Sequence, residues 1–132
     1  MTLVPHALTE RAYALLRIVS GFLFSFHGLQ KVFGLLTEQQ PPMGSQVWFG
    51  GLIELVCGAA IMLGCFASPA AFLASGTMAV AYAQFHWKFQ LDSGFFPVVN
   101  KGELAVVYCF LFLYVAAKGS GPWSIEMRRK RT

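Results

Sequence analysis

The sequence predicts an all-α protein: a four-helix transmembrane bundle with short loops, forming a single domain over residues 1–132. Two observations predict this fold class. Hydrophobic residues make up 56% of the chain and charged residues only 12%, whereas a soluble domain carries about 25% charged residues. The apolar residues also form long continuous runs, not the alternation that is typical of membrane strands. This composition excludes a disordered chain and a nucleic-acid-binding domain.

The apolar runs divide into four spans, each close to the ~20 residues that a helix needs to cross a bilayer. We expect helices over residues 12–36, 47–66, 69–89 and 99–118. Loops rich in Pro, Gly and polar residues separate the first span from the second and the third from the fourth. Between Glu54 and Lys88 the chain carries no Asp, Glu, Lys or Arg. That stretch is too long for one crossing, and Ser68-Pro69 divides it, because proline is tolerated in the first turn of a helix.

The distribution of basic residues predicts the orientation. Four of the ten Lys and Arg residues form the tail Arg128-Arg129-Lys130-Arg131, whereas the loop 37–46 has none. We therefore expect both termini in the cytoplasm, with loops 37–46 and 88–101 outside, although the second of these holds two Lys. A basic tail of this kind also suits anionic lipid. Because Arg17 interrupts the first span, we expect no cleavable signal peptide. This topology predicts a multi-pass protein of the bacterial inner (cell) membrane.

Ionisable residues inside apolar helices are the most informative feature, since a charge at the bilayer centre costs about 2.5–3.5 kcal/mol. The first span carries a polar stripe in which the steps between residues are three, four, three and four. These residues share one helix face: Arg17, Ser20, Phe24, His27 and Lys31.

The other three spans each contribute ionisable or polar groups. Glu54 lies between Gly50 and Gly58, at a spacing of four that forms a groove of small residues. In the third span Ser75, Ala79, Tyr82 and His86 share a face, and Glu103 opens the fourth span. In the predicted topology five groups fall in the outer half of the bundle and meet there: His27, Lys31, Glu54, His86 and Glu103.

Several of these residues also have a purely structural interpretation. Lys31 could extend to the outer interface, and Glu103 could be a first-turn residue favoured by the helix dipole. Arg17 could reach the inner interface. The cysteines Cys57, Cys65 and Cys109 form no C-x-x-C pair and are expected to pack in the core. The glycines Gly50, Gly58 and Gly76 suit either internal packing or the contact of a homo-oligomer.

The chain resembles the DoxX family of small four-helix membrane proteins. The matching segments are RIVSGFLFSFHGLQK (17–31), GLIELVCG (51–58), LGCFASPAA (63–71), His86, GFFPVVNKGE (94–103) and GSGPWS (119–124). Ser68 departs from the pattern, because many relatives have a basic residue before the proline. The resemblance implies an integral membrane protein associated with oxidoreduction, since the family's namesakes are linked to a thiosulfate:quinone oxidoreductase and other members to oxidative-stress complexes.

We therefore expect a membrane subunit that binds a quinone or another small redox molecule and works with a redox partner subunit in an oxidoreductase complex. His27, Glu54, His86 and Glu103 are the candidate catalytic residues, acting as proton donors and acceptors. Lys31, Arg17 and Tyr82 are the candidate ligand-binding residues. A metal site is not predicted, because the Glu-x-x-His pairs of di-iron bundles are absent. The alternative is a non-enzymatic carrier, binding protein or complex-stabilising subunit.

Overall fold

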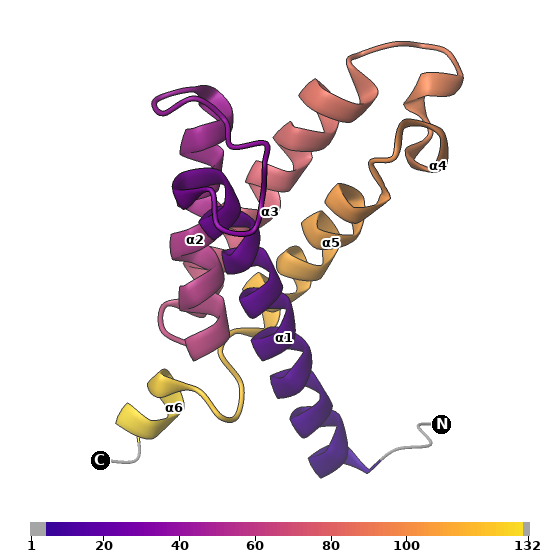
Figure 1. Ribbon diagram of the computed structural model, residues 1–132. Coiled ribbons are helices and arrows are strands. Elements are labelled where there is room, and N and C mark those ends of the chain that lie inside the picture. Colours follow the sequence, from indigo (N-terminus) through magenta and orange to yellow (C-terminus); the bar gives the residue numbers. More distant parts are fainter. Residues whose placement is uncertain (1–4, 131–132) are drawn as a thin grey trace.

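A computed structural model describes residues 5–130, and every regular element in this range is helical (Figure 1). The prediction of an all-α protein is confirmed. Arg131 of the predicted basic tail lies outside the described residues. In chain order the elements are α1 (His6–Phe33), α2 (Gln46–Leu63), α3 (Ala67–Ala81), the π-helical turn η1 (Tyr82–Trp87), the 3₁₀ turn η2 (Ser93–Phe95), α4 (Pro97–Asn100), α5 (Glu103–Lys118) and α6 (Ile125–Arg129).

The first two helices end earlier than predicted, and the reason is a glycine in each case. Gly34 has φ 68° and Gly64 has φ 64°, so both adopt the left-handed conformation that ends a helix. The start of α2 is set by Ser45, whose hydroxyl accepts a hydrogen bond from the N–H of Trp48 at 3.3 Å. Helix α1 begins directly after Pro5, six residues before the predicted span.

The third and fourth predicted helices also differ from the structure. Helix α3 continues without a break into the π-helical turn η1, whose wider turn changes the faces that later residues present. The predicted helix 99–118 is divided into α4 and α5 at Lys101, which has φ 61°. Asn100 stabilises this break, because its side-chain oxygen accepts a hydrogen bond from the N–H of Gly102 at 2.8 Å.

The four long segments run alternately up and down (Figure 1). Helices α1 and α2 pack side by side, and so do α3 and α5. In Figure 1 the two pairs diverge toward the end where α4 lies, which we call the α4 end. The start of α1, the α2–α3 turn and α6 lie at the opposite end, which we call the α6 end.

Glycines allow α1 and α2 to touch backbone to backbone. Gly21 and Gly28 on α1 face Gly51 and Gly58 on α2, so each helix carries its glycines seven residues apart. A Cβ atom at Gly58 would lie 2.7 Å from the Cα of Ser25 and 2.8 Å from the carbonyl oxygen of Gly21. Small residues at a helix interface let the backbones of membrane helices approach closely.

Helices α1 and α5 are instead kept apart by aromatic side chains. The ring of Phe24, which is fully buried, lies 5.5 Å from the ring of Tyr108 and 4.7 Å from the ring of Phe112, centroid to centroid. These rings form the centre of a core that also includes Ile61 and Val115. The bundle is therefore tight between α1 and α2 and filled by large side chains between α1 and α5.

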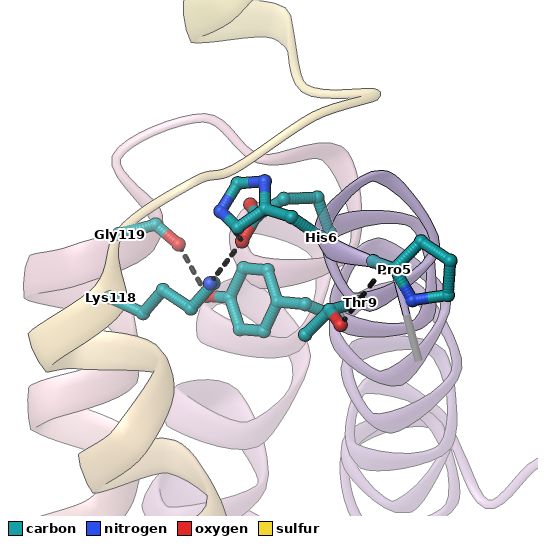
Figure 2. A network of polar contacts seen from close by, with 7 residues as sticks. Pro5, His6, Thr9, Lys118 and Gly119 are labelled. Carbon is teal, nitrogen blue, oxygen red and sulfur yellow. Dashed lines mark hydrogen bonds and ion pairs between the residues drawn. The ribbon is translucent and has the colours of Figure 1, made fainter. Parts of the chain in front are cut away.

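A group of polar contacts joins the start of α1 to the end of α5 (Figure 2). The ammonium of Lys118 lies 2.6 Å from a carboxylate oxygen of Glu10 and 4.8 Å from the centre of the Tyr13 ring. The hydroxyl of Tyr13 donates a hydrogen bond to the carbonyl of Gly119. These contacts fix the two helices to each other at the α6 end.

The outer surface of the bundle is apolar. On α1 the exposed large apolar side chains lie away from the buried face; they are Leu8, Leu15, Leu16, Val19, Phe22, Leu23 and Phe33. Such a continuous apolar surface is rare on a soluble monomer. By length and composition, two helices among the described residues are able to cross a bilayer, His6–Phe33 and Gln46–Leu63.

Candidate functional site

A cavity of about 230 Å³ lies inside the bundle toward the α4 end. Side chains from α1, α2, the α3–η1 segment and α5 form its wall. The wall includes four of the predicted site residues, which are His27, Lys31, Glu54 and His86. The other lining residues are Phe24, Met78, Ala81, Lys101, Leu104, Ala105 and Tyr108. One carboxylate, two imidazoles and an ammonium from separate helices therefore line one space, in line with the cluster expected from the depths of the spans.

Glu54 is the central polar residue of this wall. Its side chain is only 4% exposed, and its Oε1 atom lies 2.5 Å from the ammonium of Lys31, which is 33% exposed. Its Oε2 atom is buried and has no hydrogen-bond partner among residues 5–130. A buried polar atom without a partner costs about 1–3 kcal/mol. An oxygen left in this state beside a cavity marks a place where a ligand, water or proton would be stabilised.

His86 is held in one orientation by the backbone next to α5. Its Nδ1 atom lies 3.2 Å from the carbonyl oxygen of Asn100. A carbonyl oxygen only accepts hydrogen bonds, so Nδ1 must carry the hydrogen in this contact. In the neutral imidazole the other nitrogen, Nε2, is then an acceptor. The ring also stacks near Tyr82, with centroids 6.3 Å apart.

A larger and mostly apolar groove adjoins the cavity between α2 and the α3–η1 segment. Its volume is about 520 Å³, and it shares the wall residues Lys31, Glu54, Met78, Ala81 and His86 with the cavity. The remaining lining is largely apolar and includes Val47, Phe49, Ile53, Val80 and Phe85. The polar site therefore has a neighbouring space suited to a hydrophobic group.

Three of the predicted site residues lie outside the cavity wall: Glu103, Tyr82 and Arg17. Glu103 is exposed at the first position of α5. It precedes the buried Ala105 by two residues, which is about 200° around a helix, so it faces away from the core. Tyr82 lines a different, apolar pocket with Trp87 and Phe95, and its hydroxyl donates a hydrogen bond to the carbonyl of Phe95. The expected cluster of five ionisable groups thus contains four of them.

Arg17, a predicted ligand-binding residue, is fully buried and contacts the end of α2 and the segment before α6. Its Nη1 atom donates to the carbonyls of Ile61 and Met62 at 2.6 and 2.8 Å. Its Nη2 atom donates to the carbonyls of Pro122 and Trp123 at 3.2 and 3.0 Å. Arg17 therefore caps the end of α2 and holds the segment that leads to α6.

The sequence interpretation missed two polar residues of the cavity wall, Lys101 and Tyr108. Both could have been found from spacing. Residues 101, 104, 105 and 108 follow one another at steps of three, one and three, which keeps them on one side of the chain if α5 is extended by one turn. Apolar residues surround Tyr108 in the sequence, so its hydroxyl did not stand out as a polar group. Lys101 lies where the predicted loop 88–101 overlaps the predicted helix 99–118, and only its charge entered the prediction of orientation.

The cavity wall holds ammonium, imidazole, carboxylate and phenol groups, which can donate and accept protons and bind carbonyl or hydroxyl oxygens. Among the described residues no group of three or more His, Cys, Asp or Glu side chains is arranged to hold a metal ion.

An apolar outer surface around a polar internal cavity defines a small helical membrane protein. The model of the DoxX family matches residues 12–87, and the chain belongs to that family. It is also similar to an uncharacterized protein of Haemophilus influenzae, with 36% identity over 117 residues that cover 86% of this chain and 87% of the relative. No solved structure matches this chain. Family membership and the two long apolar helices together indicate a membrane protein.

Proposed function

We propose that this chain is a multi-pass membrane subunit that binds a quinone, or a closely related small redox molecule, in the cavity beside Glu54. One observation carries the proposal. A carboxylate that is 4% exposed keeps one oxygen without a partner among residues 5–130, in the wall of a cavity that also holds two histidines and two lysines. Such a group is expensive in an apolar bundle unless a ligand or proton uses it.

The lengths of the helices support four crossings. At ~1.5 Å per residue, α2 is about 27 Å long and α5 about 24 Å long, close to the ~30 Å hydrocarbon core. Trp48 and Trp87 lie toward the α4 end and Trp123 toward the α6 end, as in the aromatic belts of membrane proteins. Basic residues are concentrated at the α6 end, so this end would face the cytoplasm of a bacterial inner membrane.

The chemistry of the wall fits a quinone and its reduced form, the quinol. Lys31 and Lys101 can donate hydrogen bonds to quinone carbonyl oxygens and stabilise negative charge that develops on them. A small rotation of the Glu54 carboxylate would turn its buried Oε2 into the cavity, where this oxygen and Nε2 of His86 can accept hydrogen bonds from quinol hydroxyls. The adjoining apolar groove would take the hydrophobic substituent and let the molecule enter from the lipid.

The reaction that follows from this fit is the exchange of protons with the bound molecule. Reducing a quinone to a quinol takes up two electrons and two protons, and the reverse releases them. The electrons would pass to or from a separate redox partner subunit. Glu54 and His86 would take up or supply the protons, as groups within reach of the ligand oxygens.

The test is the binding of decyl-ubiquinone to the purified protein in lipid nanodiscs. We expect saturable binding in the wild type. The substitution Glu54→Gln should weaken it at least about tenfold, because a charged hydrogen-bond acceptor is lost. The matched control is Cys57→Ala, one turn along the same helix at a buried residue that lines neither the cavity nor the groove.

Equal effects of the two substitutions, or no saturable binding in the wild type, would overturn the proposal. Binding that depends on Glu54 but gives no turnover with the redox partner present would instead assign the chain to the alternative class of binding or carrier subunits. Flux of the quinone across proteoliposomes would then distinguish a carrier.

A further inference from the structure

We propose a second ligand site at the α6 end, where an acidic phospholipid binds with its phosphate at Arg128 and one acyl chain in the adjoining groove. The groove has a volume of about 600 Å³ and lies between α6 and the neighbouring parts of α1 and α2. Most of its wall is apolar. The lining residues are Ile18, Met62, Leu63, Trp123, Ser124, Ile125, Met127 and Arg128.

The wall of this groove is held in place by the buried guanidinium of Arg17. Arg17 donates hydrogen bonds to the carbonyls of Pro122 and Trp123 at the turn before α6. Trp123 has φ 54°, a left-handed conformation that is unfavourable for a large residue and persists only where the surroundings enforce it. Its indole is nevertheless 57% exposed. A strained turn that presents an aromatic side chain outward fits contact with the membrane interface.

The acidic residue of α6 is held mainly by hydrogen bonds inside the protein, and among the causes of its lowered pKa the charge of Lys130 is the smallest. The hydroxyl of Ser120 donates a hydrogen bond to the Glu126 carboxylate. This bond and the backbone N–H groups of Phe66 and Ala67 lower the pKa of Glu126. The backbone N–H of Glu126 also donates to the carbonyl of Gly64 at 3.2 Å, which docks α6 on the end of α2.

The outer side of α6 is therefore cationic beside an apolar groove. Arg128 and Lys130 are exposed, and Arg128 itself lines the groove. Basic side chains attract the anionic lipids of a cytoplasmic leaflet, and an arginine binds a phosphate with two parallel hydrogen bonds. The combination of a cation with an apolar wall selects a phospholipid over a free anion. This inference uses the membrane arrangement of the proposed function but is independent of the quinone cavity.

The experiment uses Trp123 as a reporter. The substitutions Trp48→Phe and Trp87→Phe leave it as the single tryptophan of the chain. The protein is reconstituted in phosphatidylcholine vesicles with a small fraction of brominated phosphatidylglycerol or, in a matched sample, brominated phosphatidylcholine. Bromine quenches tryptophan fluorescence at contact. We expect about fivefold more efficient quenching by the acidic lipid, the enrichment that one basic residue near a membrane surface supports.

Variants in this background separate the site from general surface charge. Arg128→Gln should abolish the preference for the acidic lipid. Arg11→Gln, at an exposed arginine near the start of α1, should keep it. Inorganic phosphate added in excess should also leave it unchanged.

Equal quenching by the two lipids would overturn the lipid site while leaving the membrane arrangement intact. A preference that survives Arg128→Gln, that Arg11→Gln removes to the same extent, or that phosphate removes would overturn it as well. An absence of quenching by either lipid would contradict the membrane arrangement itself, irrespective of any result for the quinone cavity.

Discussion

Each end of the bundle buries one charged side chain, and the two side chains differ in their number of hydrogen-bond partners. At the α6 end the side chain of Arg17 is fully buried and its two terminal nitrogens donate to four backbone carbonyls, while its Nε has no partner among residues 5–130. At the α4 end Glu54 has one partner, Lys31, and an oxygen without any among residues 5–130. Both charges lie between α1 and α2, so the same helix pair carries both.

The difference separates a structural charge from one that is available for chemistry. Carbonyls at the end of a helix need donors, and Arg17 supplies them, so its terminal nitrogens have no remaining capacity for a ligand. Glu54 keeps an unused acceptor beside a cavity of about 230 Å³. Sequence hydropathy ranks the two residues alike, because both are ionisable groups in an apolar span. Only the number of partners distinguishes them.

The largest effect is expected from Arg17→Met. This change leaves four carbonyls without their donor, and breaking a buried charged network costs about 3–5 kcal/mol. We expect most of the protein to be lost as aggregate, with a strongly lowered melting temperature for what remains in detergent. Arg17→Lys should be intermediate, because an ammonium donates fewer bonds in a less suitable geometry. Equal melting temperatures for the Arg17→Met and Arg11→Gln variants would show that Arg17 has no structural role.

The second largest effect is expected at the glycine contact between α1 and α2. Gly58→Ala would place a methyl group against the backbone of Ser25 and Gly21, which has no flexible atom to give way. We expect a destabilisation of about 1–3 kcal/mol, as for overpacked cores, measured as a lower melting temperature in detergent. Gly76→Ala is the control, since a Cβ there meets nothing within 4 Å among the described residues. A greater loss in Gly76→Ala would indicate that its face is covered in the membrane.

A smaller effect is expected when the ion pair at the α4 end is broken from the lysine side. Lys31→Met leaves the carboxylate of Glu54 buried without its partner. Because Lys31 is one third exposed, we expect a loss of about 1–2 kcal/mol, between the values for exposed and buried pairs. The double variant Lys31→Met with Glu54→Gln should recover part of this loss. Strictly additive melting temperatures would show that the pair contributes nothing to stability.

The smallest effect concerns pH at the α6 end. Hydrogen bonds from Ser120 and from backbone N–H groups lower the pKa of Glu126 in the folded protein. The stability that this carboxylate contributes is therefore complete above the usual glutamate pKa of about 4.3 and is lost as the pH falls through the lowered value. The contribution should stay below about 1 kcal/mol, because the group is near the surface. Hydrogen exchange of α6 amides should accelerate on acidification in the wild type and change less in Glu126→Gln.

Local patterns were sufficient to predict an all-helical chain and four of the six polar residues in the cavity wall. The stripe from Arg17 to Lys31 follows a helical repeat, so its inward face could be deduced from residue spacing alone. The predicted depth of Glu103 in the membrane could not show whether it reaches the cavity, because depth does not specify which side of α5 a residue occupies. The π-helical turn also escaped prediction, since its wider hydrogen-bonding pattern depends on how α3 meets η2 and α4. The role of Arg17 required the carbonyls of Pro122 and Trp123, which are more than 100 residues away.

The glycine contact between α1 and α2 has a mechanical consequence. Because these helices touch through their backbones, they would move as one rigid arm, with α3 and α5 forming the other. Arg17 and the contacts of Lys118 and Tyr13 hold the two arms together at the α6 end. At the α4 end Gln46 donates a hydrogen bond to Gln84 at 2.6 Å, which joins α2 to η1. A wider separation of the arms at this end would enlarge the space beside Glu54, but it would break this bond and part the rings of Phe24 and Tyr108, so a bulky guest is admitted only where its own contacts offset that loss.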